Sequence, residues 1–214
     1  MGRIKIIPLV QPFLHRLLEK PLIFELQQKL CNNYSAIAEE FSDILGQGGK
    51  RIIDIGCSTG ACARTIIDMR MNDYVGIDID PRYIETAAGR SSHGQFQAID
   101  ARSVPFQDDS FDLAMFIGVM HHMDDKLVMD CLSEVSRVLK PQGRVIIAEP
   151  VFTPGRRLSN MLLSMDRGRN IRDESGYRSL FCGYTVERQR FFDFSIHRFC
   201  SFVLRPSSSS IITA

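Results

Sequence analysis

A short loop rich in small residues is the most informative chemical feature of the sequence. Residues 54–60 read Asp-Ile-Gly-Cys-Ser-Thr-Gly and stand between a β-branched run and a helical pattern. Small residues at Gly56, Ser58 and Gly60 allow a ligand to approach the backbone closely, and a helix N-terminus after the loop favours a carboxylate. The order is G-x-S-x-G with Asp54 before it, whereas a dinucleotide site shows G-x-G-x-x-G. The loop therefore predicts a ligand other than NAD.

An acidic residue at the end of the next β-branched run is suited to binding a ribose. Asp78 lies near the end of the run 74–79, 18 residues beyond Gly60. At that position in an open α/β sheet a carboxylate can accept hydrogen bonds from both ribose hydroxyls. Asp80 stands directly before Pro81, a pattern that is typical of a helix cap. Asp78 is therefore the predicted ribose ligand.

Two adjacent histidines are the candidates for proton transfer. His121 and His122 follow the apolar run 111–117, which is typical of a strand buried on both faces. Histidine has a pKa suited to taking a proton from a hydroxyl acceptor, so His121 is the candidate catalytic residue. The alternative is a packing role at the start of the helix expected near Asp124.

Arginines become frequent after Pro150, and they suggest an anionic substrate. A guanidinium group binds phosphate or carboxylate through two parallel hydrogen bonds, so Arg167 and Arg172 are candidate substrate-binding residues. The alternative is an ordinary solvated helical face.

Strand and helix patterns alternate from residue 50 onward and must position these side chains. Short β-branched runs separated by helical stretches are typical of a parallel sheet with helices on both faces. Two final strands are too close for a crossover helix, so they predict an antiparallel hairpin. The expected fold is a three-layer α/β/α Rossmann-like fold with a mostly parallel seven-stranded sheet. The predicted strands include 51–55, 74–79, 111–117, 145–148, 186–194 and 197–204.

We divide the chain into a helical cap, one main domain and a tail. Residues 1–49 are expected to form an N-terminal helical cap, and residues 50–205 the α/β domain. Within that domain, residues 151–183 are expected to form an arginine-rich helical insertion over the active site. Residues 206–214 include four serines and predict a disordered tail.

From Lys50 to Pro150 the sequence resembles the class I, Rossmann-like, S-adenosylmethionine-dependent methyltransferases of the type 11-like group. Residues 54–60 resemble the first motif of that family, 76–80 the second and 100–112 the third. The resemblance implies S-adenosylmethionine as cofactor and S-adenosylhomocysteine as product. It also implies that Asp100 bonds the adenine amino group, that Ala101 offers its amide to the ring, and that Gly118 meets the methionine moiety. The implied cofactor-binding residues are Asp54, Gly56, Ser58, Gly60, Asp78, Ile79, Asp100, Ala101 and Gly118. Ser58 departs from the family, which usually has glycine there.

The resemblance implies an enzyme that moves a methyl group to a small-molecule acceptor by in-line displacement. We expect an anionic metabolite or a sugar derivative. The alternatives are a non-catalytic cofactor-binding scaffold, or a methyltransferase acting on a quinone, a lipid or RNA. The residues 118–121, Gly-Val-Met-His, lack the patterns of enzymes that methylate nucleic-acid bases, and a net charge of +1 does not favour phosphate binding, so no nucleic-acid partner is expected.

The composition limits the class of protein, the kinds of metal site and the location that we expect. The chain has 214 residues, of which 44% are hydrophobic and 24% charged, as in ordinary globular proteins. The six cysteines include no C-x-x-C pair and no histidine at ligand spacing, so we expect reduced thiols and no metal site. Apolar runs are too short for a signal peptide or a membrane span, which predicts a cytoplasmic protein. The apolar first helices leave peripheral membrane contact open, and the sequence does not predict an oligomeric state.

Overall fold

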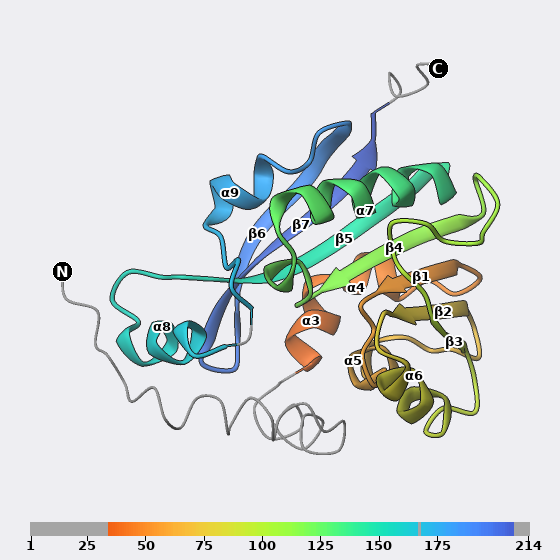
Figure 1. Cartoon of the computed structure of the whole chain (residues 1–214), viewed down its shortest axis with the longest axis horizontal. Helices are drawn as coiled ribbons and strands as arrows, with labels where there is room; N and C mark the ends of the chain where they lie inside the picture. The colour runs from red at the N-terminus through yellow and green to blue at the C-terminus, as the bar shows by residue number, and fades with distance from the viewer. Residues whose placement is uncertain (1–33, 167, 208–214) are drawn as a thin grey trace.

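The structure is a computed structural model that describes residues 34–166 and 168–207 (Figure 1). Its seven strands form one sheet in the order β3-β2-β1-β4-β5-β7-β6. Strands β1 to β5 pair in parallel, and β7 runs antiparallel between β5 and β6. This topology confirms the predicted α/β fold and its C-terminal hairpin. The strands are β1 Arg51–Ile55, β2 Asp73–Asp78, β3 Gln95–Ala98, β4 Phe111–Ile117, β5 Leu139–Val151, β6 Tyr184–Phe194 and β7 His197–Pro206.

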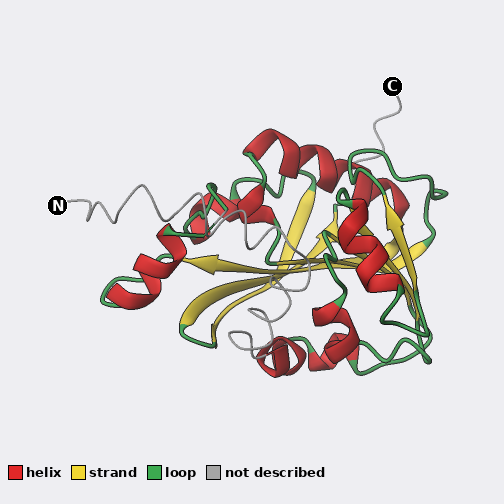
Figure 2. Ribbon diagram, turned by 60° about the horizontal axis from the view of Figure 1, so that its bottom comes forward, coloured by secondary structure: helices red, strands yellow, loops and turns green. Residues whose placement is uncertain are grey.

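Helices cover both faces of the sheet (Figure 2). One buried cluster joins β1 and β4 to α7 through residues such as Ile53 and Val135, and a second joins the opposite face to α3 through Ile52 and Ile37. Neighbouring residues of β1 point to opposite faces because side chains alternate along a strand. The helices are α3 Tyr34–Glu40, α4 Ser42–Leu45, α5 Ala61–Ile66, α6 Pro81–Ala88, the 3-10 helix η1 Met120–His122, α7 Asp125–Val138, α8 Arg157–Ser164 and α9 Glu174–Arg178.

Sequence patterns missed some element boundaries. Strand β3 was not predicted because it lies at the sheet edge, where its Gln-Phe-Gln-Ala sequence needs no continuous apolar run. Within the expected helical cap, α3 and α4 are separated at Phe41, which is fully buried. Asp80 caps α6 as predicted, accepting a hydrogen bond from the Arg82 amide.

The expected cap and tail are described only in part. Residues 1–33 and 208–214 lie outside the described residues. Helices α3 and α4 pack on one face of the sheet, because Ile37 and Ile44 are buried in the same cluster as residues of β1, β4 and β5. The division into a cap and a main domain stays a prediction. Strand β7 ends at Pro206, one residue beyond the predicted domain boundary. Among the described residues, no helix is long and apolar enough to cross a membrane.

Candidate cofactor and acceptor site

The loop after β1 is shaped by glycines that hold left-handed backbone conformations. Gly56 has φ +71°, and a Cβ there would lie 2.3 Å from Val119 Cγ2. Gly60, with φ +69°, caps α5. Ser58 also has a positive φ, +51°, at the position where the resembled family usually has glycine. The loop therefore has the tight backbone that a closely bound ligand requires.

Asp78 lies beside this loop at the carboxyl end of β2. Its Oδ2 accepts a hydrogen bond from the Ser58 amide at 3.0 Å, and its Oδ1 accepts one from the Asp80 amide at 2.9 Å. Burial raises the pKa of Asp78, although these amides oppose the shift. A carboxylate has about four acceptor positions, so the two fixed hydrogen bonds orient the group and leave capacity for two hydroxyls. This geometry suits the predicted ribose contact.

The surface next to Asp78 is apolar and exposed. Ile79 has 74% of its surface exposed, the most among the exposed large hydrophobic residues of the described chain. An exposed isoleucine beside a polar ligand position offers an apolar face for a flat ring such as adenine.

Asp54 has a buried supporting position. It is 5% exposed and accepts a hydrogen bond from the Tyr74 hydroxyl at 2.7 Å. Burial raises the pKa of Asp54 to about 7, while the Tyr74 hydroxyl opposes the shift and Asp78 adds to it. The structure thus places this predicted cofactor residue beneath the loop, where it contacts the protein. The sequence did not identify Tyr74, because its role depends on pairing between β1 and β2.

Asp100 follows β3 and is already paired. The Arg102 guanidinium holds it through a 2.6 Å ion pair and keeps its pKa below the usual range, mainly by that hydrogen bond. The implied contact with an adenine amino group would share this carboxylate with Arg102. Ala101, next in the chain, packs against the core.

Gly118 directly follows β4, at the start of the turn that leads into η1. It has φ +64°, and the nearest heavy atom to an added Cβ would be His121 Cε1 at 3.9 Å. Glu149 on β5 is fully buried and holds the turn that follows. Its Oε1 accepts hydrogen bonds from the Val119 and Met120 amides at 2.8 and 2.7 Å. These contacts to η1 depend on β4 lying beside β5, so they do not follow from spacing in the sequence.

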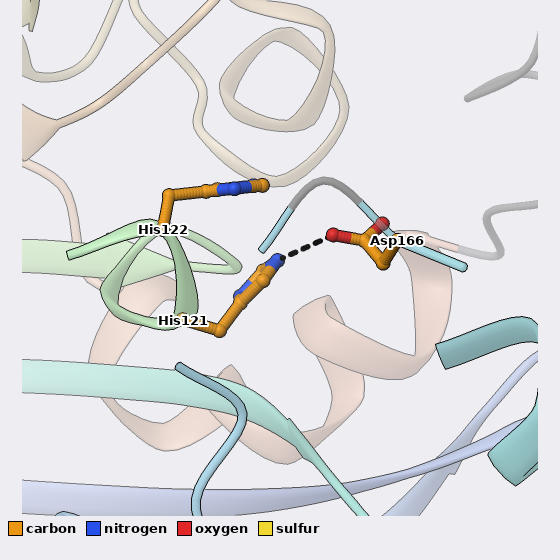
Figure 3. Close-up of side chains that lie close together, drawn as sticks. All are labelled: His121, His122 and Asp166. Atoms are coloured by element: carbon orange, nitrogen blue, oxygen red, sulfur yellow. Dashed lines mark ion pairs between the residues drawn. The ribbon is translucent and has the colours of Figure 1, made fainter. Parts of the chain in front are cut away.

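His121 lies between two carboxylates. Its Nδ1 is 2.7 Å from Glu149 Oε2, and its Nε2 is 3.5 Å from Asp166 Oδ1 (Figure 3). Burial lowers the pKa of His121, but Glu149 and Asp166 outweigh that effect and raise it to about 9. Both ring nitrogens thus already face carboxylates of the chain, so neither is left to take a proton from an acceptor hydroxyl. These contacts favour the packing role over that of a general base.

Asp166 belongs to a segment that packs on η1. Burial raises the pKa of Asp166, but the hydrogen bond and charge of His121 outweigh it and lower the pKa to about 2. The Asn170 amide donates to the His121 carbonyl at 3.0 Å. The predicted insertion 151–183 therefore contacts the turn after β4; whether it covers an active site stays a prediction.

Arg172 is engaged within the chain. Its five N–H groups donate to Asp125 and to the carbonyls of Met120, Met123 and Asn170, and its side chain is 10% exposed. A guanidinium has five donors, so none remains for a substrate anion. In this arrangement the side chain anchors the segment to η1, and substrate binding by Arg172 stays a prediction. Arg167 lies outside the described residues.

The structure also brings together a set of possible metal ligands. Ligand atoms of His121, His122 and Asp166 all lie within 4.8 Å of one another. We predicted no metal site because the sequence has no C-x-x-C pair and no histidine at ligand spacing from a cysteine. These patterns could not detect this cluster, because Asp166 is distant in sequence from both histidines.

Comparison with known proteins agrees with the motif analysis. Residues 52–143 match a family model described as a methyltransferase domain. An O-methyltransferase of Pyrenophora dematioidea is 31% identical over 152 residues, covering 63% of this chain and 56% of that protein. The O-methyltransferase rstn1 of Aspergillus nomiae is 36% identical over 125 residues, covering 56% of this chain and 53% of that protein. The chain thus spans about half the length of these curated relatives.

A solved structure supports the fold. The PH0226 protein from Pyrococcus horikoshii OT3 superposes with a TM-score of 0.66 at 21% identity, covering 81% of this chain and 89% of that one. The family model and the relatives agree with the motifs after β1 and β2, and they support a class I S-adenosylmethionine-dependent methyltransferase domain over residues 52–143.

Proposed function

We propose that this chain transfers the methyl group of S-adenosylmethionine to an oxygen atom of a small-molecule acceptor. The observation that carries the proposal is the oriented carboxylate of Asp78 beside the glycine loop, at the carboxyl ends of adjacent parallel strands. Ligands of open α/β sheets bind at that edge. The two relatives described as O-methyltransferases favour oxygen as the methylated atom.

The described residues suggest how the cofactor lies along this edge. Asp78 would accept the ribose hydroxyls, and Ile79 would cover one face of the adenine. Asp100 and Ala101 would contact the adenine edge, while Gly118 would admit the methionine moiety. The order of β3, β2, β1 and β4 in the sheet supports this arrangement.

Methyl transfer from a sulfonium requires little covalent help from the protein. The acceptor oxygen attacks the methyl carbon, the bond from that carbon to sulfur breaks, and the hydroxyl proton leaves to water. Holding the reacting atoms about 3 to 3.5 Å apart supplies much of the rate enhancement. His121 is then a positioning residue, since its contacts fix the turn beside Gly118.

The finer proposal of an anionic metabolite or sugar derivative has less support. With Arg172 engaged, exposed arginines such as Arg157 and Arg169 remain candidates for attracting an anion. A quinone, a lipid or RNA remains an alternative acceptor, and a cofactor-binding scaffold is the alternative without catalysis.

An acceptor screen tests the proposal. The full chain is incubated with S-adenosylmethionine and separate pools of sugar derivatives, phenolic acids, quinols and RNA, and S-adenosylhomocysteine is measured by mass spectrometry. We expect acceptor-dependent product with a small-molecule pool and its loss in Asp78→Asn, with Asp80→Asn as the matched control. Cofactor binding with no product from any pool would contradict the proposal and favour the scaffold.

A further inference from the structure

Two histidines and a carboxylate meet just beyond the carboxyl end of β4. His121 and His122 extend from η1, and Asp166 faces them from the segment after α8 (Figure 3). One possible ligand atom from each residue lies within 4.8 Å of the others. Two imidazoles and one carboxylate form a donor set typical of zinc and other first-row divalent cations.

The distance between His121 and Asp166 already suits a shared cation. Nε2 of His121 lies 3.5 Å from Asp166 Oδ1. Two ligands of a tetrahedral zinc ion, each about 2.1 Å from the metal, lie about 3.4 Å apart. Only His122 must move closer. Its ring centroid is 4.1 Å from that of His121, its side chain is exposed, and its ligand atom lies within 4.8 Å of those of His121 and Asp166.

Glu149 prepares His121 for this role. A metal-binding histidine commonly donates its second ring N–H to a carboxylate, which fixes the tautomer and directs the other nitrogen to the metal. His121 Nδ1 lies 2.7 Å from Glu149 Oε2, and Glu149 is fully buried and held by backbone amides of the same turn. The Nε2 atom is therefore directed toward Asp166 before any cation binds.

We propose that His121, His122 and Asp166 bind one divalent transition cation of the zinc type. Three protein ligands leave at least one coordination position open, as in catalytic rather than structural zinc sites. His121 also adjoins Gly118, because a Cβ on that glycine would lie 3.9 Å from His121 Cε1. The cation therefore lies next to the place where the methionine moiety is expected.

The open position also defines the acceptor. An acceptor hydroxyl bound there is polarised by the cation, so its proton leaves to water as the oxygen attacks the methyl carbon. The preferred acceptors are then molecules whose methylated oxygen can bind a metal, such as phenols or enols with a neighbouring oxygen. This extension rests on the proposed methyl transfer, whereas cation binding does not.

Metal titration of the full chain without a polyhistidine tag tests the site. The protein is dialysed against a chelator, exchanged into metal-free buffer and titrated with Zn²⁺ by calorimetry, and Co²⁺ binding is followed by visible absorption. We expect saturation at one Zn²⁺ per chain. His122→Ala and Asp166→Asn, which change exposed side chains, should each weaken Zn²⁺ binding at least about 10-fold. His93→Ala, which removes an exposed histidine elsewhere, should have no effect.

Two results would overturn the site: the absence of saturable Zn²⁺ binding, or equal Zn²⁺ affinity in His122→Ala and the unaltered chain. The same preparations are titrated with S-adenosylhomocysteine to separate the two proposals. Binding of S-adenosylhomocysteine without Zn²⁺ binding would overturn only the metal site. Zn²⁺ binding without methyl transfer to any pool would overturn only the proposed function.

Discussion

Replacing Asp54 with asparagine should change how the stability of the unliganded chain depends on pH. Asp54 is buried beneath the glycine loop, and its pKa is raised from 3.8 to about 7. The folded chain therefore holds a proton on Asp54 over a range in which the unfolded chain has lost it. Because the folded state binds the proton more tightly, the free energy of unfolding falls as pH rises from the pKa of Asp54 in the unfolded state to its pKa in the folded state. Above the folded-state pKa this contribution levels off.

The size of this effect follows from the two pKa values. Between about pH 5 and about pH 8 the shifted carboxyl lowers the free energy of unfolding by roughly 2 to 3 kcal/mol, at about 1.4 kcal/mol per pH unit below the folded pKa. Asp54→Asn keeps an oxygen that can accept the Tyr74 hydroxyl but has no proton to lose. The free energy of unfolding of Asp54→Asn should therefore not fall with pH for this reason. The difference between its free energy of unfolding and that of the unaltered chain should become more positive as pH rises.

Urea unfolding at several pH values measures the difference. Asp112→Asn is the matched control, because the hydrogen bonds from the Arg51 amide and Lys140 outweigh burial and keep the pKa of Asp112 low. That carboxyl stays ionised across the range, so its loss should shift stability by a constant amount. A stability curve for Asp54→Asn that runs parallel to that of the unaltered chain would refute the assignment of a buried, titrating carboxyl.

Three further substitutions test other parts of the site. Gly118→Ala and Gly155→Ala each place a side chain at positive φ in open surroundings, so each should lower the free energy of unfolding in urea by about 1 kcal/mol. Only Gly118→Ala should also weaken S-adenosylhomocysteine binding. Equal binding in both variants would refute the placement of the methionine moiety. Arg172→Ala removes five internal hydrogen bonds and should lower stability by about 3 kcal/mol, whereas exposed Arg169→Ala should change it little; similar values would show that Arg172 is not an anchor. Ser58→Gly relieves a positive φ and should raise stability by about 1 kcal/mol in thermal melts; an unchanged or lower melting temperature would contradict backbone strain at Ser58.

The sequence was most informative where one local pattern determines one element. The continuous apolar run at β4 and the Asp-Pro start of α6 predicted those elements correctly, because burial on both faces and helix capping depend on neighbouring residues. The positive φ of Gly56 and Gly60 likewise belongs to the local turn, whereas the close approach of Val119 to Gly56 depends on the tertiary fold. Edge strand β3 was missed because an edge position relaxes the apolar pattern.

Contacts between distant segments could not be predicted from spacing. Arg172 looked like an anion ligand, yet the approach of its segment to η1 engages its donors inside the chain. His121 looked like a base, but Glu149 and Asp166 flank its ring from two other segments. Charged side chains take their roles from their partners, and those partners depend on the tertiary fold.

Calorimetric titration of the full chain with S-adenosylhomocysteine tests the cofactor site most directly. We expect one bound molecule per chain, with affinity reduced at least about 10-fold in Asp78→Asn, since a lost charge-assisted contact is worth about 1.5 to 3 kcal/mol. Asp80→Asn, which alters the cap of α6 and the ion pair with Arg82, should bind as the unaltered chain does. Failure of the unaltered chain to bind, or equal affinity in Asp78→Asn, would contradict the placement of the cofactor beside β2.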